Sequence, residues 1–203
     1  MRGSGNMIKV IMFDLLGVLV SYDRVAHFGH MSKELGVGES RLAEVLVPLW
    51  ELVDCGTLTS QEMKRIATAK LVVSRYKLDK VVNFRMFRVN RELEALMKRL
   101  RKRYDIVLLT NISRGAYLLA ARNGLDRGAY RKAFVSGYMK CRKPQPEAYR
   151  YALDRMRISP DEAVFVDDNA NNVNGAKALG INAIRFTGNA QLSKDLSRCG
   201  VIL

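Results

Sequence analysis

The stretch VIMFDLLGVL, residues 10 to 19, contains the feature that decides the fold. Its first four residues continue an apolar, β-branched-rich run that begins at Ile8, and such a run predicts a buried strand. The strand ends on a carboxylate, Asp14, and a Leu-Leu-Gly turn follows it. A buried strand that ends on a charge needs a reason, and the rest of the chain supplies one.

Strand and helix patterns alternate strictly after residue 88. Strands are predicted at 8–13, 105–110, 133–136, 163–168 and 182–187, and helices at 91–103, 114–123, 146–155 and 171–179. Alternation of this kind implies right-handed crossovers and an α/β, Rossmann-like, doubly wound parallel sheet. Residues 22–88 have only helical patterns, with Ser40 and Ser60 as expected N-caps. We therefore predict a core domain of residues 1–21 and 89–203, with a small helical domain, 22–88, inserted after the first strand.

Polar residues end three of the predicted strands. They are Asp14, the pair Thr110-Asn111 and the pair Asp167-Asp168. Ligands of open parallel sheets bind outside the carboxyl ends of the strands, so these side chains are expected to converge. Carboxylates brought together there repel one another unless a cation neutralises them, and oxygen ligands suit Mg²⁺.

A fourth element is KPQPEAYRYAL, residues 143 to 153. Lys143 precedes a proline, which keeps its backbone extended, and Pro146 suits the first turn of the next helix. The ammonium group is thus presented from a stiff loop, where it can neutralise a phosphate and a carboxylate. A Lys-Pro pair alone is a weak signal, and its value lies in its order relative to the other elements.

The ordered elements resemble the haloacid dehalogenase (HAD) superfamily. The four motifs are Asp14-x-x-Gly17, Thr110-Asn111, Lys143-Pro144-x-Pro146 and Asp167-Asp168-x-x-x-Asn172. The resemblance covers nearly the whole chain, and the inserted helices are similar to that superfamily's cap, with CGTLTSQEM (55–63) like a loop-helix segment of such caps. The branch it resembles holds sugar-1-phosphate phosphatases and the N-terminal phosphatase domain of soluble epoxide hydrolases.

The resemblance implies a role for each motif. Asp14 is expected to be the nucleophile that forms an aspartyl-phosphate. Thr110 and the backbone near Asn111 are expected to bind the phosphoryl oxygens, and Lys143 to offset negative charge. Asn172 is expected either to hydrogen-bond Lys143 or Asp167, or to be a polar residue at a helix terminus. The Mg²⁺ ligands implied by the resemblance are Asp14, the backbone carbonyl of Leu16, Asp168 and, in the outer shell, Asp167.

Leu16 departs from the pattern of most phosphatases in this superfamily. They have a second Asp two places after the nucleophile, which protonates the leaving group and later activates water. Leucine does neither, and general acid–base catalysis is worth roughly 10²–10⁴-fold. The branch named above includes members without an acid here. Water, the substrate or a cap residue is left to supply the proton.

Three function classes follow from these observations. The favoured one is Mg²⁺-dependent hydrolysis of a small phosphomonoester, with reduced activity expected because of Leu16. The alternative is a weakly catalytic or non-catalytic HAD-like protein that binds a phosphorylated or polyanionic partner. A further alternative is a 2-haloacid dehalogenase or a phosphonatase. Dehalogenases lack the acidic pair, and a phosphonatase needs a cap lysine, for which no context distinguishes Lys33, Lys64 and Lys70.

Composition narrows the setting. The 203 residues include 48% hydrophobic residues and have a net charge of +14. That charge favours anionic partners, but the basic run MKRLRKRY (97–104) is interpreted as a solvated helix face, and no nucleic-acid motif supports binding of nucleic acid. No apolar run is long enough to span a membrane, so we expect a cytoplasmic protein, a monomer or homodimer. Its substrate is expected to be a small phosphorylated metabolite, selected by the cap. Trp50 in the cap is expected to pack rather than to stack on substrate.

Overall fold

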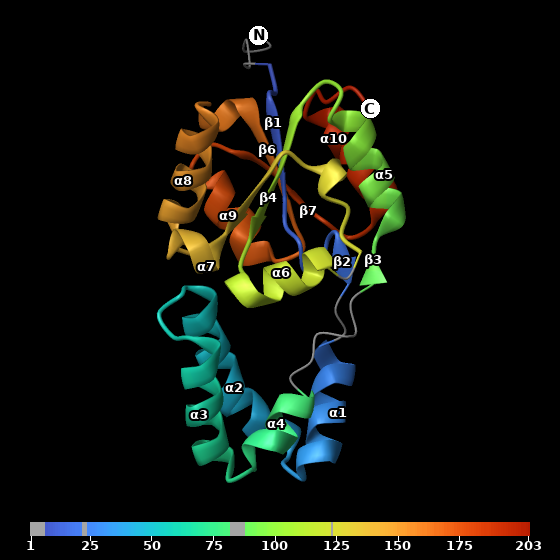
Figure 1. Ribbon diagram of the computed structural model, residues 1–203. Coiled ribbons are helices and arrows are strands. Elements are labelled where there is room, and N and C mark those ends of the chain that lie inside the picture. The colour runs from blue at the N-terminus through green and yellow to red at the C-terminus, as the bar shows by residue number, and fades with distance from the viewer. Residues whose placement is uncertain (1–6, 22–23, 82–87, 123) are drawn as a thin grey trace.

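A parallel sheet with helices on both faces forms one part of the molecule, and a group of four helices forms the other (Figure 1). The computed structural model describes residues 7–21, 24–81, 88–122 and 124–203. Within those residues the sheet has the order β5-β4-β1-β6-β7. Its strands are β1 (Val10–Phe13), β4 (Asp105–Thr110), β5 (Lys132–Val135), β6 (Ala163–Asp167) and β7 (Asn182–Arg185).

The strands of this sheet all run parallel, with β1 at the centre. Val10 pairs with Asp105 of β4 on one side and with Ala163 of β6 on the other. The outer strands continue the same direction. The carboxyl ends of β1, β4 and β6 therefore lie at one edge, which faces the helical part of the molecule (Figure 1). The predicted doubly wound α/β fold is confirmed.

Alternate residues of each strand point to opposite faces, as the pleat requires. Ile11 and Phe13 lie in one apolar cluster, whereas Val10 and Met12 lie in the other. The first cluster is covered by α5 (Arg91–Leu100), α6 (Arg114–Arg122) and α10 (Asn189–Arg198). The second is covered by α8 (Pro146–Met156) and α9 (Ala170–Lys177). Because both faces are buried, the strands are continuously apolar.

Short elements complete the core domain. The helix α7 (Ser136–Met139) follows β5, and two 3₁₀ turns are η1 (Arg127–Ala129) and η2 (Pro160–Glu162). A small antiparallel pair, β2 (Val20–Ser21) with β3 (Arg88–Val89), stands where the chain leaves and re-enters the core. The sequence analysis did not predict α10 or this pair.

The inserted helices form the cap and have an apolar core of their own. They are α1 (Arg24–Leu35), α2 (Glu39–Asp54), α3 (Ser60–Leu71) and α4 (Arg75–Val81). Met31, Leu46 and Leu78 are fully buried among them. The predicted domain boundaries adjoin residues 22–23 and 82–87, which lie outside the described residues, so the boundaries stay predictions.

Both predicted N-caps in the cap are wrong by one or two residues. Helix α2 begins at Glu39 with Gly38 as its N-cap, so Ser40 lies inside the helix. Helix α3 begins at Ser60, and Thr59 is its N-cap. The reason is a capping box: Thr59 Oγ1 accepts a hydrogen bond from the Glu62 N–H at 3.2 Å, and Glu62 Oε2 accepts one from the Thr59 N–H at 2.8 Å.

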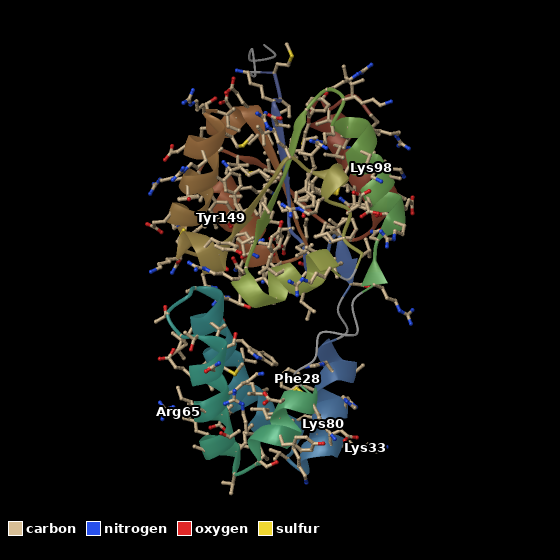
Figure 2. The ribbon with its side chains drawn as sticks, in the orientation of Figure 1. Phe28, Lys33, Arg65, Lys80, Lys98 and Tyr149 are labelled. Atoms are coloured by element: carbon tan, nitrogen blue, oxygen red, sulfur yellow. The ribbon has the colours of Figure 1, made fainter. Side chains whose placement is uncertain are left out.

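Charged side chains stand on the outside of both parts (Figure 2). Lys33 and Arg65 are exposed on the cap, whereas Phe28 is buried in it. In the basic run, Lys98 is exposed and forms an ion pair with Asp126 at 2.5 Å, while Met97 is buried. The run is therefore an outer helix face, as expected. In the described part of the chain, no helix combines the length and apolarity that a membrane span requires.

Candidate active site between the sheet edge and the cap

Three carboxylates meet at the edge of the sheet. Asp14 follows β1, Asp167 ends β6, and Asp168 comes directly after it. A hydrogen bond of 2.8 Å from the Asp14 N–H to the Val166 carbonyl extends the pairing of the two strands to this point. One oxygen from each carboxylate lies within 4.8 Å of the others. The convergence expected from the strand ends is therefore present, and it places Asp14 and Asp167 in buried positions with Asp168 exposed.

Lys143 lies between two of these carboxylates. Its Nζ is 2.9 Å from Asp14 Oδ1 and 2.6 Å from Asp167 Oδ2, and the whole residue is only 1% exposed. Asp167 also accepts hydrogen bonds from the Asn172 side chain, at 3.0 and 3.2 Å, and from the Asn169 N–H at 2.8 Å. Of the roles considered for Asn172, the structure has the contact with Asp167. A buried charge needs such partners, because desolvation is costly.

Asn111 fixes the lysine loop (residues 140–145). Its side-chain amide donates to the Lys143 carbonyl at 2.8 Å and its Oδ1 accepts from the Lys143 N–H at 2.9 Å. The side chain of Asn111 is thus used to hold the backbone of Lys143. The neighbouring Thr110 is 1% exposed, and its Oγ1 has no hydrogen-bond partner among the described residues. A buried, unpartnered hydroxyl at this edge is a group that a ligand oxygen would satisfy.

The turn that starts at Asp14, the expected nucleophile, packs directly against Asp168, and residues 14–20 are called the nucleophile turn for that reason. Gly17 has a φ of +86°, and a Cβ at this position would lie 2.2 Å from Asp168 Oδ2. Only glycine fits there. Leu16 precedes it, half-buried, and packs against the core cluster that contains Phe13. The turn is closed by hydrogen bonds from the Gly17 N–H to the Val20 carbonyl and from the Val20 N–H to the Leu15 carbonyl, at 2.8 and 2.7 Å.

The residues at this edge fit a Mg²⁺ ion. The donors are hard oxygens, and no His or Cys lies in the carboxylate group. Burial raises the pKa of Asp14 to about 7, and the Asp167 charge acts in the same direction, while Lys143 opposes both. Burial and Asp167 also raise the pKa of Asp168. Because the pKa values of Asp14 and Asp168 are raised, a divalent cation bound between them would stabilise their ionised forms.

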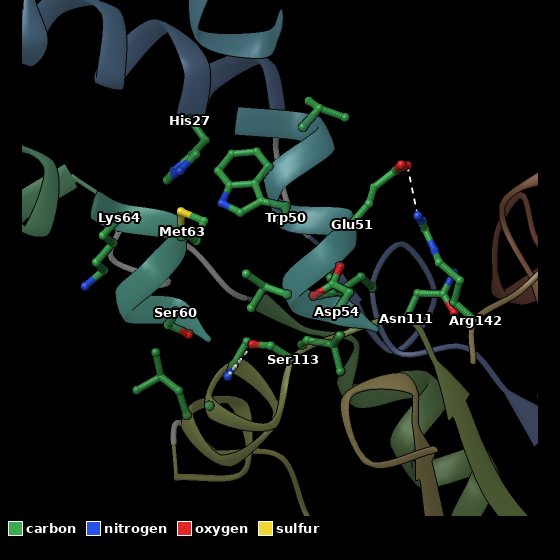
Figure 3. A pocket seen from close by; sticks show the side chains of 17 residues that line it. His27, Trp50, Glu51, Asp54, Ser60, Met63, Lys64, Asn111, Ser113 and Arg142 are labelled. Carbon is green, nitrogen blue, oxygen red and sulfur yellow. Dashed lines mark hydrogen bonds and ion pairs between the residues drawn. The ribbon is translucent and has the colours of Figure 1, made fainter. Parts of the chain in front are cut away.

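A cavity of about 440 Å³ lies between the sheet edge and the cap (Figure 3). Most of the surface that lines it is apolar, and the lining side chains come from both parts of the molecule. The apolar residues are Leu16, Val47, Trp50, Val53, Met63, Ile112, Ala116 and Leu119. The polar and charged residues are His27, Glu51, Asp54, Ser60, Lys64, Asn111, Ser113 and Arg142. The cavity therefore adjoins the nucleophile turn at Leu16 and the Thr110–Ser113 loop at Asn111.

Trp50 both packs and faces the cavity. Its ring meets that of Phe28 edge-on, with centroids 5.6 Å apart, and it also lines the cavity. The expectation of a packing role is therefore met, but packing is not its whole role. Of the three cap lysines considered for imine chemistry, Lys64 is the one that lines the cavity, and its Nζ is paired with Asp79 at 2.6 Å.

Arg142 connects the lysine loop to the cap. Its guanidinium is 3.0 Å from Glu51 on α2, and its buried Nε has no hydrogen-bond partner among the described residues. Tyr138, at the other end of this segment, is exposed and lies under the Arg114 guanidinium. Arg142 therefore lies in the cavity wall as well as in the lysine loop.

Asp54 is the ionisable residue that sequence reasoning missed. It is the last residue of α2, half-buried, and it lines the cavity (Figure 3). Burial raises its pKa to about 7, although Arg142 and a hydrogen bond from the Ser113 backbone N–H lower it. One signal was available: a carboxylate at the C-terminal end of a helix opposes the helix dipole, and such a residue needs another reason to be there.

Comparison with known proteins agrees with this arrangement. A family model described as haloacid dehalogenase-like hydrolase matches residues 8–180. The chain belongs to this family. The chain is similar to a D-ribitol-5-phosphate phosphatase from Bacteroides thetaiotaomicron, which is 25% identical over 94% of this chain and 98% of its own length. The expected resemblance is confirmed.

Other relatives of this HAD-like hydrolase match less of their own length. Drimenol cyclase from Aspergillus calidoustus is 25% identical over 94% of this chain, which spans only 36% of the cyclase. An (S)-2-haloacid dehalogenase from Pseudomonas is 43% identical over 80 residues, or 35% of each chain. The chain thus spans about a third of the cyclase, and the match to the dehalogenase covers about a third of that protein.

Solved structures share the fold. The structure of a HAD family enzyme from Bacteroides thetaiotaomicron, in complex with magnesium and inorganic phosphate, has a TM-score of 0.78 at 25% identity and covers 90% of this chain and 96% of its own. A predicted HAD-like hydrolase from Porphyromonas gingivalis has a TM-score of 0.79 at 22% identity, covering 98% of this chain and all of its own. The second likeness concerns the fold alone.

Proposed function

We propose that this HAD-like hydrolase cleaves small phosphomonoesters in a Mg²⁺-dependent reaction through an aspartyl-phosphate. The observation that carries the proposal is the buried Lys143, held between Asp14 and Asp167, beside the unpartnered hydroxyl of Thr110. This set supplies a nucleophile, a cation and a donor at one edge. The phosphatase relative and the neighbour with bound magnesium and phosphate support the same class of reaction.

In this proposal Asp14 attacks phosphorus and the ester bond to the alcohol breaks. Thr110 donates a hydrogen bond to an oxygen of the transferring group, and the ammonium of Lys143 reduces the repulsion between that group and the nucleophile. Mg²⁺, when bound, would supply further neutralisation of the phosphoryl charge. Asp14, the Leu16 carbonyl and Asp168 would hold the ion, with Asp167 in the outer shell. Asn172 and Asn169 keep Asp167 oriented for this purpose.

The cavity supports a preference for esters whose leaving group has an apolar carbon skeleton. Its apolar walls suit the carbon skeleton of an organic phosphate better than a highly charged one. Leu16 belongs to that wall. A dehalogenase is the less supported alternative, because dehalogenases lack the acidic pair, whereas Asp167 and Asp168 converge with Asp14 in a group that could hold a cation. A polyanionic partner for the basic surface, a monomeric or homodimeric state and a cytoplasmic location stay predictions of the sequence.

A screen of phosphorylated metabolites and p-nitrophenyl phosphate, with and without Mg²⁺, tests the proposal. We expect turnover that requires Mg²⁺ and is lost in Asp14→Asn. Asp154→Asn, an exposed aspartate on α8, is the matched control and should keep full activity. A 2-haloacid assay run in parallel detects the dehalogenase alternative. No turnover of any phosphate ester with Mg²⁺, or an Asp14→Asn variant as active as the parent, would overturn the proposal.

A further inference from the structure

We propose that Asp54, on the cap, protonates the leaving group in place of the acid that Leu16 replaces, and then takes a proton from the attacking water. This inference rests on the proposed phosphatase function. It assigns to the cap a catalytic step that the nucleophile turn of this chain lacks. Three features of the structure support it: the position of Asp54, the contacts that hold the end of α2, and the other ionisable groups of the cavity.

Asp54 shares a cavity with the nucleophile turn. Both Asp54 and Leu16 line it, and Asn111 lines it between the sheet edge and the cap. The Asp54 carboxylate lies at the end of α2 and lines the same cavity as Asn111 and Ser113 of the core (Figure 3). An ester whose phosphoryl group lies beside Asp14 and Thr110 extends its alcohol portion into this cavity. The bridging oxygen is then on the side from which Asp54 approaches.

Two features hold the end of α2 near the sheet edge. The backbone N–H of Ser113 is close enough to the Asp54 carboxyl group to lower its pKa, and Ser113 lies three residues beyond Thr110 in the loop expected to bind the phosphoryl oxygens. The Glu51–Arg142 ion pair, 3.0 Å long, joins α2 to the lysine loop one helical turn before Asp54. The end of α2 is thus held at the sheet edge by two separate segments of the core, so the acid has a defined position there.

The environment poises Asp54 for proton transfer near neutral pH. Burial raises its pKa to about 7, the charge of Glu51 adds to this, and Arg142 with the Ser113 N–H opposes it. A general acid works best when its pKa is near the working pH. The ionisable groups around it are Glu51 and Cys55 on its own segment, Arg142 from the lysine loop, and His27 and Lys64 across the cavity.

The other ionisable groups of the cavity are less suited to this task. Glu51 is more than half exposed and is paired with Arg142, and Lys64 is paired with Asp79. Burial and His30 lower the pKa of His27, so His27 holds little of the acid form at neutral pH. Among these cavity residues Asp54 is therefore the best suited general acid, because its pKa of about 7 keeps part of it protonated at pH 7.

Asp54 exchanges its proton during two displacements at phosphorus. In the first, an Asp14 oxygen forms a bond to phosphorus while the bond from phosphorus to the alcohol oxygen breaks. The alcohol oxygen takes the proton of the Asp54 carboxyl group. The alcohol leaves, and Asp54 is now a carboxylate. It removes a proton from water as the water oxygen attacks phosphorus, and the bond to Asp14 breaks. Inorganic phosphate, the Asp14 carboxylate and protonated Asp54 result.

Asp54→Asn, assayed in full-length protein with Mg²⁺, tests the inference through the leaving group. Alkyl phosphates need a proton on the departing oxygen, so their kcat/KM should fall by about 10²-fold. For p-nitrophenyl phosphate, whose leaving group departs as an anion, kcat/KM should change little. The ratio of the two is measured on one sample, so partial loss of folded protein cancels. In the parent, kcat/KM for the alkyl ester should fall as the pH rises through about 7, and this fall should be absent in the variant.

Three further variants complete the experiment. Asp54→Glu should restore most of the alkyl-ester activity, and Leu16→Asp placed in the Asp54→Asn background should restore part of it. Glu44→Gln, at an exposed carboxylate earlier on the same helix and outside the cavity lining, is the matched control and should leave the alkyl-to-aryl ratio unchanged. An equal loss on both ester classes in Asp54→Asn, or no loss, overturns the role of Asp54. Absence of turnover in the parent overturns the proposed function itself, which separates the two failures.

Discussion

The sheet edge and the cap cavity treat charge in opposite ways. At the edge, the buried carboxylates of Asp14 and Asp167 have Lys143 between them, and Asp167 has two further donors. In the cavity, Asp54 has apolar neighbours, one backbone donor and a guanidinium that is already paired with Glu51. Burial raises the pKa of both Asp14 and Asp54 to about 7. At the edge, Lys143 and the proposed Mg²⁺ favour the ionised form of Asp14, whereas the proposed role of Asp54 depends on its keeping that proton. A substitution should therefore act differently in the two regions.

The largest effect should come from removing the central cation of the edge. Lys143→Met leaves two buried carboxylates without their shared partner, and breaking a buried pair in this way costs about 3–5 kcal/mol of unfolding free energy. Turnover of every ester should be lost to the same extent, because Lys143 assists the attack of Asp14 on phosphorus, which is a step that all the esters share. Urea unfolding and p-nitrophenyl phosphate hydrolysis measure the two effects. Lys177→Met, an exposed lysine on α9, is the control, and a cost below about 1 kcal/mol for Lys143→Met would contradict the assigned role.

An intermediate effect is expected from adding an acid where the cavity meets the edge. Leu16→Asp in the parent should raise kcat/KM of alkyl phosphates by about tenfold, at the low end of general acid catalysis because Asp54 already contributes. Aryl phosphates with good leaving groups should gain little. Steady-state kinetics on a matched alkyl and aryl pair decides the point. Equal gains on both would mean that leaving-group protonation is not the step that Leu16 leaves incomplete.

The smallest effect should come from the cavity wall. Trp50→Phe keeps an aromatic ring against Phe28 but shortens the surface that faces the cavity. For a bulky aryl ester such as naphthyl phosphate, KM should rise about threefold, which corresponds to about 0.6 kcal/mol of lost aromatic contact. Acetyl phosphate, which does not reach the wall, should be unaffected. If KM for both substrates stays at the parent value, Trp50 serves packing alone.

The same contrast explains what the sequence could predict. Asp14, Thr110 and Asp167 end strands, and the topology of a parallel sheet brings strand ends to one edge whatever the details of packing. Lys143 joined them through its order along the chain. Asp54 could not be found this way, because its position depends on how α2 packs in the cap and how the cap meets the core. Neither follows from hydrophobic periodicity, which places residues on a helix face but does not say what that face meets.

Local capping chemistry shows the same limit on a smaller scale. Ser60 was expected to be the N-cap of α3, but Thr59 is the N-cap, because Glu62 stands three residues after it and closes a capping box. Helix α10 has a polar sequence, NAQLSKDLSR, in which Leu192 and Leu196 are the buried residues. So few apolar positions give a weak periodic signal, although both leucines are fully buried in the core cluster.

The paired hydrogen bonds between Asn111 and the backbone of Lys143 have a consequence for redesign. They fix the relative position of two loops that are 32 residues apart in the sequence. Neither loop can be exchanged alone without moving the ammonium group that the other one positions. An engineer who wants a new substrate for this scaffold can vary the cap residues that line the cavity, apart from Asp54 and Glu51 on α2. At the sheet edge, the two loops have to be transplanted together.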